Sequence, residues 1–329
     1  MDNRVALRAL LVATIVVLGG VLGDETMAED TAEALPKFDE LWNFRDPAAT
    51  EAAFRALVPK ARESGDKDYL GQLLSQIART RGLQRDFDGA HALLDEAEAA
   101  ITPDCTKARI RILLERGRAF NSGGEKEKSL PLFLEAFVTA HKAGGLDNLM
   151  VDAVHMLGIV AEGSSSVQWN VLAIDLAEKS DDELAKRWLG ALYNNIGWSF
   201  HELGDYDTAK DYWERGVRWH SERKTGRGLL IAKWTIGRVL RSMERYDEAI
   251  EKQKALLADY EREGLEEAGY CAEEMGENLL ALDRGDEAKL WFARAYEKLS
   301  KDEWLKANEA DRLARMKELA GDAVTGDDE

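Results

Sequence analysis

Histidine, serine and cysteine side chains are the groups in this chain that could supply a base, a nucleophile or a metal ligand. None of the histidines falls in the spacing His-Glu-x-x-His, and neither a Gly-x-Ser-x-Gly motif nor a phosphate-binding glycine loop occurs. The run Ser164-Ser165-Ser166 has no base placed beside it, so we interpret it as a turn between helices. The sequence therefore predicts a protein that is not an enzyme and holds neither a cofactor nor a metal. The histidines are His91, His141, His155, His201 and His220.

A hydrophobic signature centred on a small residue recurs along the chain and must position these polar residues. Its copies follow one another every 39 to 41 residues. A fixed period of this size predicts a stacked repeat architecture. The copies are Ile77-Ala78, Arg116-Gly117, Leu157-Gly158, Ile196-Gly197, Ile236-Gly237 and Met275-Gly276.

Each copy carries further residues at fixed distances from its small residue. In most copies a second small residue follows after twelve positions, and a larger one after sixteen. Because residues three or four apart share a helix face, we expect two helices per repeat, with the two small residues facing each other where the helices cross. Gly204 and Asp205 are typical of the turn between them, since glycine adopts the left-handed conformation and aspartate caps the next helix. The second helix of a repeat is expected to end at a glycine in three places, which are Gly65, Gly145 and Gly264.

This pattern resembles the tetratricopeptide repeat (TPR) family. One copy matches the family's consensus positions at Tyr193, Ile196, Gly197, Phe200, Gly204, Tyr206, Ala209, Trp213 and Gly216. The usual unit has about 34 residues, so the longer period here is similar to the kinesin-light-chain branch, as is Asn194-Asn195.

The resemblance implies an all-α fold in a bacterial protein. We expect a right-handed α-solenoid of about six helical hairpins, with capping helices at both ends. The expected repeats lie near residues 66–103, 104–144, 145–180, 181–225, 226–264 and 265–300, within a solenoid that spans 46–320.

The two cysteines, Cys105 and Cys271, would lie about four repeats apart in such an array. A disulfide needs Cα atoms within about 7 Å, so an intrachain bridge is not expected. Neither cysteine has the Cys-x-x-Cys spacing of a redox or metal motif.

The formal net charge of −18 limits the partners that electrostatics would favour. Nucleic acid and anionic membranes attract basic proteins, so we expect neither as a partner. The acidic balance favours solubility, and a second interpretation is attraction of basic partners.

The first residues predict export. Arg4 and Arg8 precede the uncharged run 9–23, which fits a signal peptide over residues 1–28 and is short for a membrane anchor, although an anchor stays open. We therefore expect an exported, periplasmic or extracytoplasmic protein, with an N-terminal membrane anchor as the alternative to cleavage. The alternative is a cytoplasmic protein whose translation starts at Met27.

The ends of the array are predicted to differ from its repeats. Residues 29–45 are expected to form a polar linker, and Asp46-Pro47 to cap and begin the second helix of an incomplete repeat. A single C-terminal capping helix is expected over 302–320, followed by a disordered acidic tail over 321–329.

The resemblance places a binding groove on the first helix of each repeat, at positions three before, one after and four after the small residue. These exposed positions include tryptophan and arginine, which are enriched at binding hot spots, and asparagine, which can bond a peptide backbone. Under a second interpretation Trp198 and Trp234 belong to the core, and the arginines pair with Glu162, Glu273 and Glu277. The candidate groove residues are Arg79, Arg118, Asn121, His155, Asn194, Trp198, His201, Trp234, Arg238 and Arg241.

Two functions remain for such a groove. The first is a scaffold or adaptor without catalytic activity, whose partner is a protein or peptide segment with acidic and apolar residues. The second is a sensor, similar to bacterial TPR receptors for signalling peptides, whose superhelix curvature changes when peptide binds.

Overall fold

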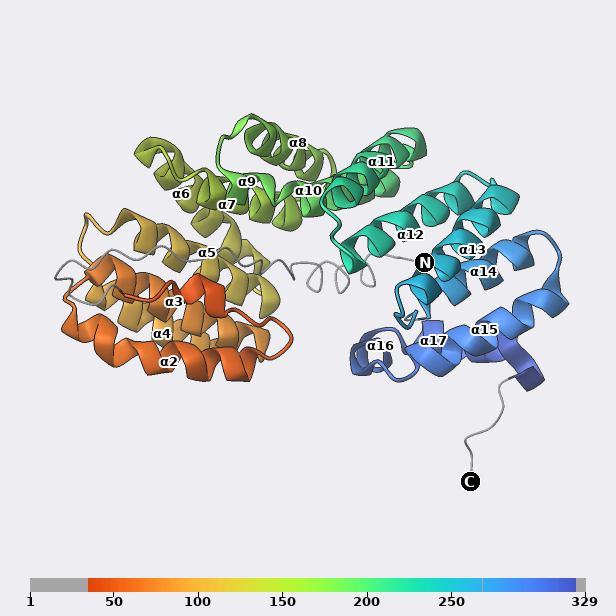
Figure 1. Cartoon of the computed structure of the whole chain (residues 1–329), viewed down its shortest axis with the longest axis horizontal. Helices are drawn as coiled ribbons and strands as arrows, with labels where there is room; N and C mark the ends of the chain where they lie inside the picture. Colours follow the sequence, from red (N-terminus) through yellow and green to blue (C-terminus); the bar gives the residue numbers. More distant parts are fainter. Residues whose placement is uncertain (1–34, 268, 324–329) are drawn as a thin grey trace, which may run out of the picture. The chain divides into compact units, whose positions relative to one another are not determined.

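The structure is a computed structural model that describes residues 35–267 and 269–323 (Figure 1). The expected signal peptide or anchor (1–28), residues 29–34 of the expected linker and residues 324–329 of the expected tail lie outside this description. Within the described residues, no helix is both long and apolar enough to cross a membrane.

Two compact units divide the chain at residues 192 and 193. We call the described residues up to Leu192 the N-unit and those from Tyr193 the C-unit, and α10 (Leu189–Glu202) contributes residues to both. The N-unit contains η1 (Phe38–Leu41), α2 (Pro47–Glu63), α3 (Lys67–Leu83), α4 (Phe87–Ala100), α5 (Thr106–Ser122), α6 (Lys126–Ala143), α7 (Asp147–Val160), α8 (Gly163–Lys179) and α9 (Glu183–Lys186). The C-unit contains α11 (Tyr206–Glu222), α12 (Arg227–Ser242), α13 (Tyr246–Arg262), α14 (Tyr270–Ala281), α15 (Gly285–Leu299), α16 (Glu303–Asn308), α17 (Ala310–Ala320) and η2 (Gly321–Ala323).

The expected helical hairpins are confirmed. The hairpins are the helix pairs α3–α4, α5–α6, α7–α8, α10–α11, α12–α13 and α14–α15. Within each unit a second helix packs on the first helix of the next hairpin, as α6 does on α7 and α13 on α14. The described chain is therefore all-α and built of stacked hairpins, with no strand in either described range.

The small residue of the signature lets the two helices of a hairpin approach closely, but its neighbour differs from the expected one. A Cβ atom on Gly197 would lie 2.2 Å from Nε1 of Trp213, which is sixteen positions further on. The small residue at twelve positions is therefore not the one that covers the glycine. Phe133 covers Gly117 and Phe292 covers Gly276 in the same way.

The turns within hairpins repeat one backbone conformation. Gly204 has a φ of 79°, and the Asp205 carboxylate accepts the N–H of Thr208, as the sequence predicts. The same left-handed conformation recurs seven residues after the small residue in other copies, and it is costlier where that residue is not glycine. Those residues are Arg85, Gly124, Glu244 and Asp283.

The start of the array departs from the expected polar linker. Asp46 caps α2 through the N–H of Ala49 and Pro47 begins the helix, both as predicted. Residues 35–45, however, pack onto the fold: Phe38 is 4% exposed and lies edge-on to Phe54, with ring centroids 6.0 Å apart. Aromatic burial thus makes this segment part of the N-unit core.

The C-terminal cap is two helices rather than one. Asp302 begins α16 by accepting N–H groups of Trp304 and Leu305, and the chain then breaks at Glu309, whose φ is −136°. The second helix, α17, packs on α15 through Leu313 and Met316. Both cysteines are buried free thiols, Cys105 in the N-unit and Cys271 in the C-unit.

Candidate functional site

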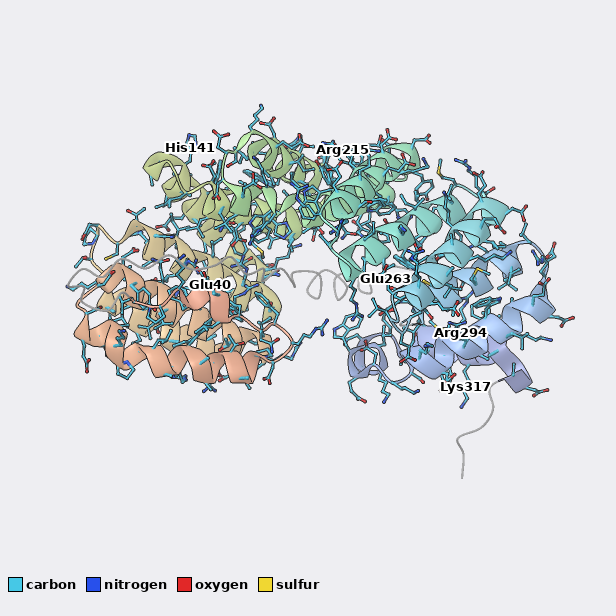
Figure 2. All side chains as sticks on the ribbon, in the orientation of Figure 1. Glu40, His141, Arg215, Glu263, Arg294 and Lys317 are labelled. Carbon is cyan, nitrogen blue, oxygen red and sulfur yellow. The ribbon has the colours of Figure 1, made fainter. Side chains whose placement is uncertain are left out.

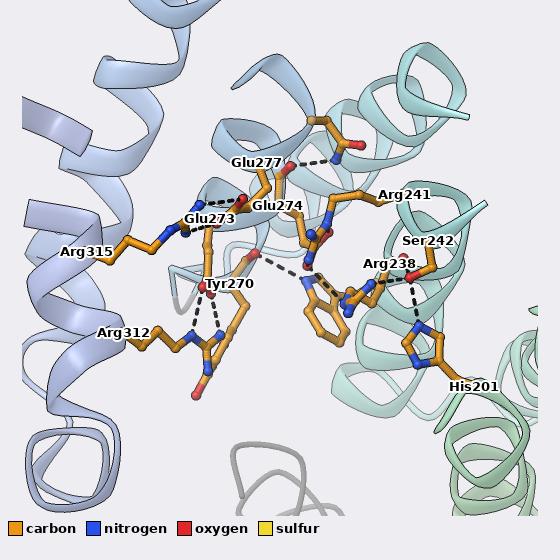
Figure 3. A network of polar contacts seen from close by, with 12 residues as sticks. His201, Arg238, Arg241, Ser242, Tyr270, Glu273, Glu274, Glu277, Arg312 and Arg315 are labelled. Carbon is orange, nitrogen blue, oxygen red and sulfur yellow. Dashed lines mark hydrogen bonds and ion pairs between the residues drawn. The ribbon is translucent and has the colours of Figure 1, made fainter. Parts of the chain in front are cut away.

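A row of ion pairs joins the helices α12, α14 and α17 of the C-unit, and Figure 3 shows it at close range. We call its charged residues the C-row. They alternate in sign from helix to helix, so each guanidinium meets a carboxylate of a neighbouring element. The C-row comprises Arg238, Arg241, Glu273, Glu274, Glu277, Arg312 and Arg315.

Glu274 is the centre of the first part of the C-row. Its side chain is 4% exposed, and Arg241 donates to both carboxylate oxygens, at 2.7 and 2.9 Å (Figure 3). Arg238 approaches the same carboxylate at 3.5 Å. Burial alone would raise the pKa of Glu274, but the attraction of Arg241 and Arg238 outweighs it and holds that pKa below its ordinary value.

The second part of the C-row connects α14 to α17. Arg312 donates from Nε to Glu273 at 2.8 Å, and also bonds Glu309 on its own segment. Burial, reinforced by the neighbouring carboxylates of Glu274 and Glu277, raises the pKa of Glu273. Arg315 forks onto Glu277 with its own side chain 49% exposed, so this pair is the most open to solvent of the C-row contacts.

A serine and a histidine lie at the α10 end of the C-row. Nε2 of His201 and Oγ of Ser242 are 2.8 Å apart, and Arg238 donates to the same hydroxyl at 2.5 Å (Figure 3). Burial, with the positive charges of Arg238 and Arg241, lowers the pKa of His201 to about 4. The hydroxyl is thus held by a cation beside a weakly basic imidazole, which is unsuited to a nucleophile that needs a stronger base.

Aromatic rings fill the space beneath the charges. Trp198 is 6% exposed and packs edge-on to Trp213, with centroids 4.7 Å apart, so it belongs to the core. Trp234 and Tyr270 are only partly buried, and Nε1 of Trp234 donates to the Tyr270 carbonyl at 3.3 Å. Trp234 therefore serves both the core and the surface beside the C-row.

The N-unit carries a related row on α3, α5 and α7. Arg79 donates to Glu115 at 3.0 Å, and Arg118 bonds both Glu115, at 2.7 Å, and Asp152. Burial would raise the pKa of Glu115, but Arg118 and Arg79 hold it below its ordinary value. We call these four residues the N-row.

The segment before α2 lies against the helices of the N-row. Tyr69 donates to the Pro36 carbonyl at 2.7 Å, and Trp42 donates from Nε1 to Gln76 at 3.1 Å. Arg111 on α5 forks onto Asp39 at 2.7 and 2.9 Å. This face of α3 and α5 is therefore in contact with the chain's own residues 36–42.

The expectation that the groove residues are exposed is wrong for three of them. His155 is 3%, Trp198 6% and Arg238 8% exposed, because His155 packs on Trp188 and the other two lie inside the aromatic and ionic contacts described above. The remaining candidates are partly buried: Arg79, Arg118, Asn121, Asn194, His201, Trp234 and Arg241.

The structure groups the candidates by unit and pairs their arginines with two carboxylates that the sequence pattern had not indicated. Arg79 and Arg118 share Glu115, while Arg238 and Arg241 share Glu274. Of the glutamates in the alternative pairing, Glu273 pairs with Arg312 and Glu277 with Arg315, and Glu162 contacts Lys126. Asn194 instead accepts Nε1–H of Trp213 with its backbone carbonyl, at 3.1 Å.

A periodic signal for these pairs is present in the sequence. Arg79 and Arg238 both stand one position after the small residue of their copy. Their partners Glu115 and Glu274 both stand two positions before the small residue of a following copy. Within the described ranges no cluster of three or more His, Cys, Asp or Glu side chains is arranged to hold a metal ion.

Comparison with known proteins supports the repeat architecture. Residues 190–220, which cover α10 and α11, match the family model described as tetratricopeptide repeat. No curated protein matches the chain significantly in sequence.

Solved structures with similar folds share little sequence with the chain. The signal transduction ATPase with a tetratricopeptide repeat sensor from Pyrococcus horikoshii superposes with a TM-score of 0.63 at 12% identity, over 84% of this chain and 44% of that protein. NprR, solved in complex with its cognate peptide NprX, has a TM-score of 0.53 at 16% identity, over 86% and 82%. Aspartyl phosphate phosphatase F from Bacillus subtilis has a TM-score of 0.52 at 14% identity, over 81% and 76%. This chain spans less than half the length of the first of these proteins.

Proposed function

We propose that this chain, whose residues 190–220 match the tetratricopeptide repeat model, is a non-catalytic scaffold that binds a peptide or protein segment on the C-row face of α12, α14 and α17. The observation that carries the proposal is the C-row itself, a set of arginines fixed in place beside two partly exposed aromatic rings. NprR supports a peptide as the ligand, since it shares this fold and was solved with one.

The ion pairs with glutamate do not use every N–H group of the C-row arginines within the described chain. A guanidinium carries five N–H groups, and Arg241 uses only Nε and one terminal nitrogen on Glu274 within the described chain. The carboxylate therefore fixes the plane of the guanidinium while other N–H groups stay available. A donor held in place loses less freedom on binding, which favours affinity for a ligand carbonyl or carboxylate.

The aromatic rings extend the proposed ligand chemistry from acidic to apolar groups. Trp234 and Tyr270 contact each other edge-on, with centroids 6.3 Å apart, and Arg312 lies 5.7 Å from the Tyr270 ring. Burial raises the pKa of Tyr270 to about 12, so its hydroxyl stays protonated and can donate to a ligand at neutral pH. A segment with an acidic residue close to an apolar one fits this combination.

The exposed pair Arg315–Glu277 gives the sharpest test. A random peptide library displayed on phage would be selected on the full chain, and the enriched peptide titrated calorimetrically against variants. Arg315→Gln should weaken binding about tenfold, while Glu277→Gln should strengthen it, because that substitution removes the carboxylate that competes for Arg315. The matched control is Arg245→Gln on α13, whose ion pair with Glu248 lies outside the C-row. Equal affinities for all four proteins would refute the proposal.

A ligand-responsive sensor is the second candidate, and the pair Arg241–Glu274 favours it. This contact joins α12 to α14, so a ligand carboxylate that took Arg241 from Glu274 would loosen the contact between neighbouring hairpins. X-ray scattering with and without the selected peptide tests this candidate: a change in the radius of gyration at saturation supports the sensor, and unchanged dimensions support the scaffold.

The place of action remains a separate proposal. We infer export from Arg4, Arg8 and the uncharged run 9–23, with a cytoplasmic start at Met27 as the alternative. N-terminal sequencing of the native protein, together with cell fractionation, would distinguish the two.

A further inference from the structure

A basic stretch of the chain crosses from α11 to α12. Residues 215–243 contain eight arginine and lysine residues and one carboxylate, Glu222, although the whole chain has a net charge of −18. Figure 2 marks Arg215, the first of these cations, on α11. Like charges on one segment repel one another, so each cation is stabilised where it meets an anionic or aromatic partner.

Four of the eight cations have such partners within the C-unit. Two of them belong to the C-row and pair with Glu274. Lys233 donates to Asp259 at 2.5 Å, and the Arg215 guanidinium lies 4.7 Å from the centre of the Tyr193 ring. The packing of the C-unit therefore accounts for these four.

The other four cations lie within about one helical turn of the connection between α11 and α12. We call them the basic turn: Arg218, Arg223, Lys224 and Arg227. Arg218, Lys224 and Arg227 are exposed, and among the described residues none of them has a carboxylate within ion-pair distance. Arg223 has only its chain neighbour Glu222, at 4.0 Å, and the side chain of that glutamate is 73% exposed. The basic turn thus presents positive charge to solvent that the described chain does not neutralise.

Contacts within the connection hold the basic turn in one conformation. Nδ1 of His220 and Oγ1 of Thr225 are 2.7 Å apart, and the Arg223 guanidinium lies 4.6 Å from the centre of the Trp219 ring. Lys224 has a φ of 50°, a left-handed conformation that is costly for a residue with a side chain. Cations carried on a backbone that is already fixed lose less freedom when a partner binds.

The stability of the fold does not explain the basic turn. Helix α12 begins at Arg227, and its N-cap Gly226 supplies no side-chain cap. The N-terminus of a helix carries a partial positive charge, so cations beside it are unfavourable. The repulsion between neighbouring cations adds to this cost. An anionic group bound at the basic turn would relieve both.

We propose that the basic turn is the docking surface for a short acidic segment of a partner protein. Carboxylates suit this surface because arginine binds them through two parallel N–H groups. The surface shares no residue with the C-row, so it is independent of the function proposed above.

The charges around the basic turn favour a short segment over an extended polyanion. Residues 202–214 hold five carboxylates and one lysine, and residues 244–267 hold nine carboxylates and four cations. Most of these residues belong to α11 and α13, which both pack on α12. A nucleic acid or an anionic membrane extends past the four cations and meets these carboxylates, whereas a short acidic segment ends before them.

Calorimetric titration of the full chain tests the proposal, with acetylated and amidated hexaglutamate as the probe. Hexaglutamate should bind in about 0.1 M NaCl and at least about tenfold more weakly in about 1 M NaCl, because the screening length falls from about 10 to about 3 Å. A capped peptide of alternating glycine and serine, which carries no charge, should not bind.

Substitutions of exposed side chains locate the binding without disturbing the core. Lys224→Gln and Arg227→Gln should each weaken hexaglutamate binding about threefold, and the triple variant with Arg218→Gln about tenfold or more. The matched control is Arg85→Gln, which makes the same change of charge at an exposed arginine of the N-unit and should leave the affinity unchanged. Circular dichroism would verify that each variant is folded.

Four outcomes would overturn the proposal. The first is no binding of hexaglutamate at about 1 mM, and the second is equal affinity of the wild type and the triple variant. The third is a loss of affinity in Arg315→Gln but in none of the basic-turn variants, which would assign the peptide to the C-row. The fourth is tighter binding of a single-stranded thymidine dodecamer or of phosphatidylglycerol vesicles than of hexaglutamate.

Discussion

The substitution Glu274→Gln isolates the charge at the centre of the C-row. Glutamine has nearly the shape of glutamate and keeps one acceptor oxygen, so the helix α14 and its packing are preserved. What is lost is the single negative charge that faces both Arg238 and Arg241. Their side chains are 10% and 25% exposed, so too little water reaches either guanidinium to compensate for the lost carboxylate.

The expected cost follows from this burial. Removing one partner of a buried ion pair costs about 3–5 kcal/mol. Because the amide oxygen can still accept one hydrogen bond, we expect the lower end, about 3 kcal/mol in the free energy of unfolding. The control is Glu277→Gln, one helical turn further along α14, whose partner Arg315 is 49% exposed. Its expected cost is below about 1 kcal/mol, because water screens and replaces the pair.

Hydrogen exchange measures the effect of both substitutions on the stability of the helices that carry them. Repeat arrays open locally, so amide protection of α12 and α14 is more informative than a single global midpoint. A loss of 3 kcal/mol corresponds to roughly a hundredfold faster exchange through local opening. Equal protection in Glu274→Gln and Glu277→Gln would refute the argument that burial makes the Glu274 pairs important.

Three further predictions concern stability. Gln253 is 0% exposed, and neither its amide nitrogen nor its amide oxygen has a hydrogen-bond partner in the described chain. Gln253→Met should therefore stabilise the protein by about 1–2 kcal/mol. A lower midpoint of urea unfolding would contradict this. Gly197→Ala should destabilise the protein by about 1–3 kcal/mol, because the new Cβ atom would clash with Trp213. Gly285→Ala, whose Cβ would have no atom within 4 Å, should leave the thermal unfolding midpoint nearly unchanged. Burial, and then Arg118, lowers the pKa of His155 to about 3, so the unfolded chain binds a proton that the folded chain refuses. His155 alone should therefore lower the free energy of unfolding by about 2 kcal/mol between about pH 7 and about pH 5, beside similar contributions from His201 and His220. His155→Gln should reduce the pH slope by that amount in urea titrations; an unchanged slope would contradict it.

The hairpins were predictable because their signals are local and periodic. The small residue at Gly197, the left-handed turn at Gly204 and the caps at Asp46 and Asp205 each act within a few residues of the chain. The ends of the array carry no such period. Phe38 sits in a short 3-10 turn without a repeat around it, so its burial against Phe54 depends on tertiary packing that a pattern search does not see.

The candidate site was predictable as a set of positions but not as a set of contacts. Position one after the small residue holds Arg79 in the first copy and Arg238 in the fifth, but Trp198 in the fourth. The arginines pair with carboxylates on the next first helix, while Trp198 packs on Trp213, so equivalent positions make contacts of different chemistry. Which of these occurs depends on the residue two positions before the next small residue, which is Glu115 or Glu274 where the pair forms.

Each unit contains one buried cysteine, whose reaction with a thiol reagent would report the local opening of that unit. Burial raises the pKa of Cys271 well above its ordinary value, so its thiol is unreactive unless the hairpins around it open. Cys105, enclosed between α4 and α5, is likewise shielded. A thiol-modifying reagent would therefore label the N-unit at one site and the C-unit at the other, each at a rate set by local opening. Mass spectrometry of the two modified peptides then gives separate opening rates for the two halves of one unmodified chain.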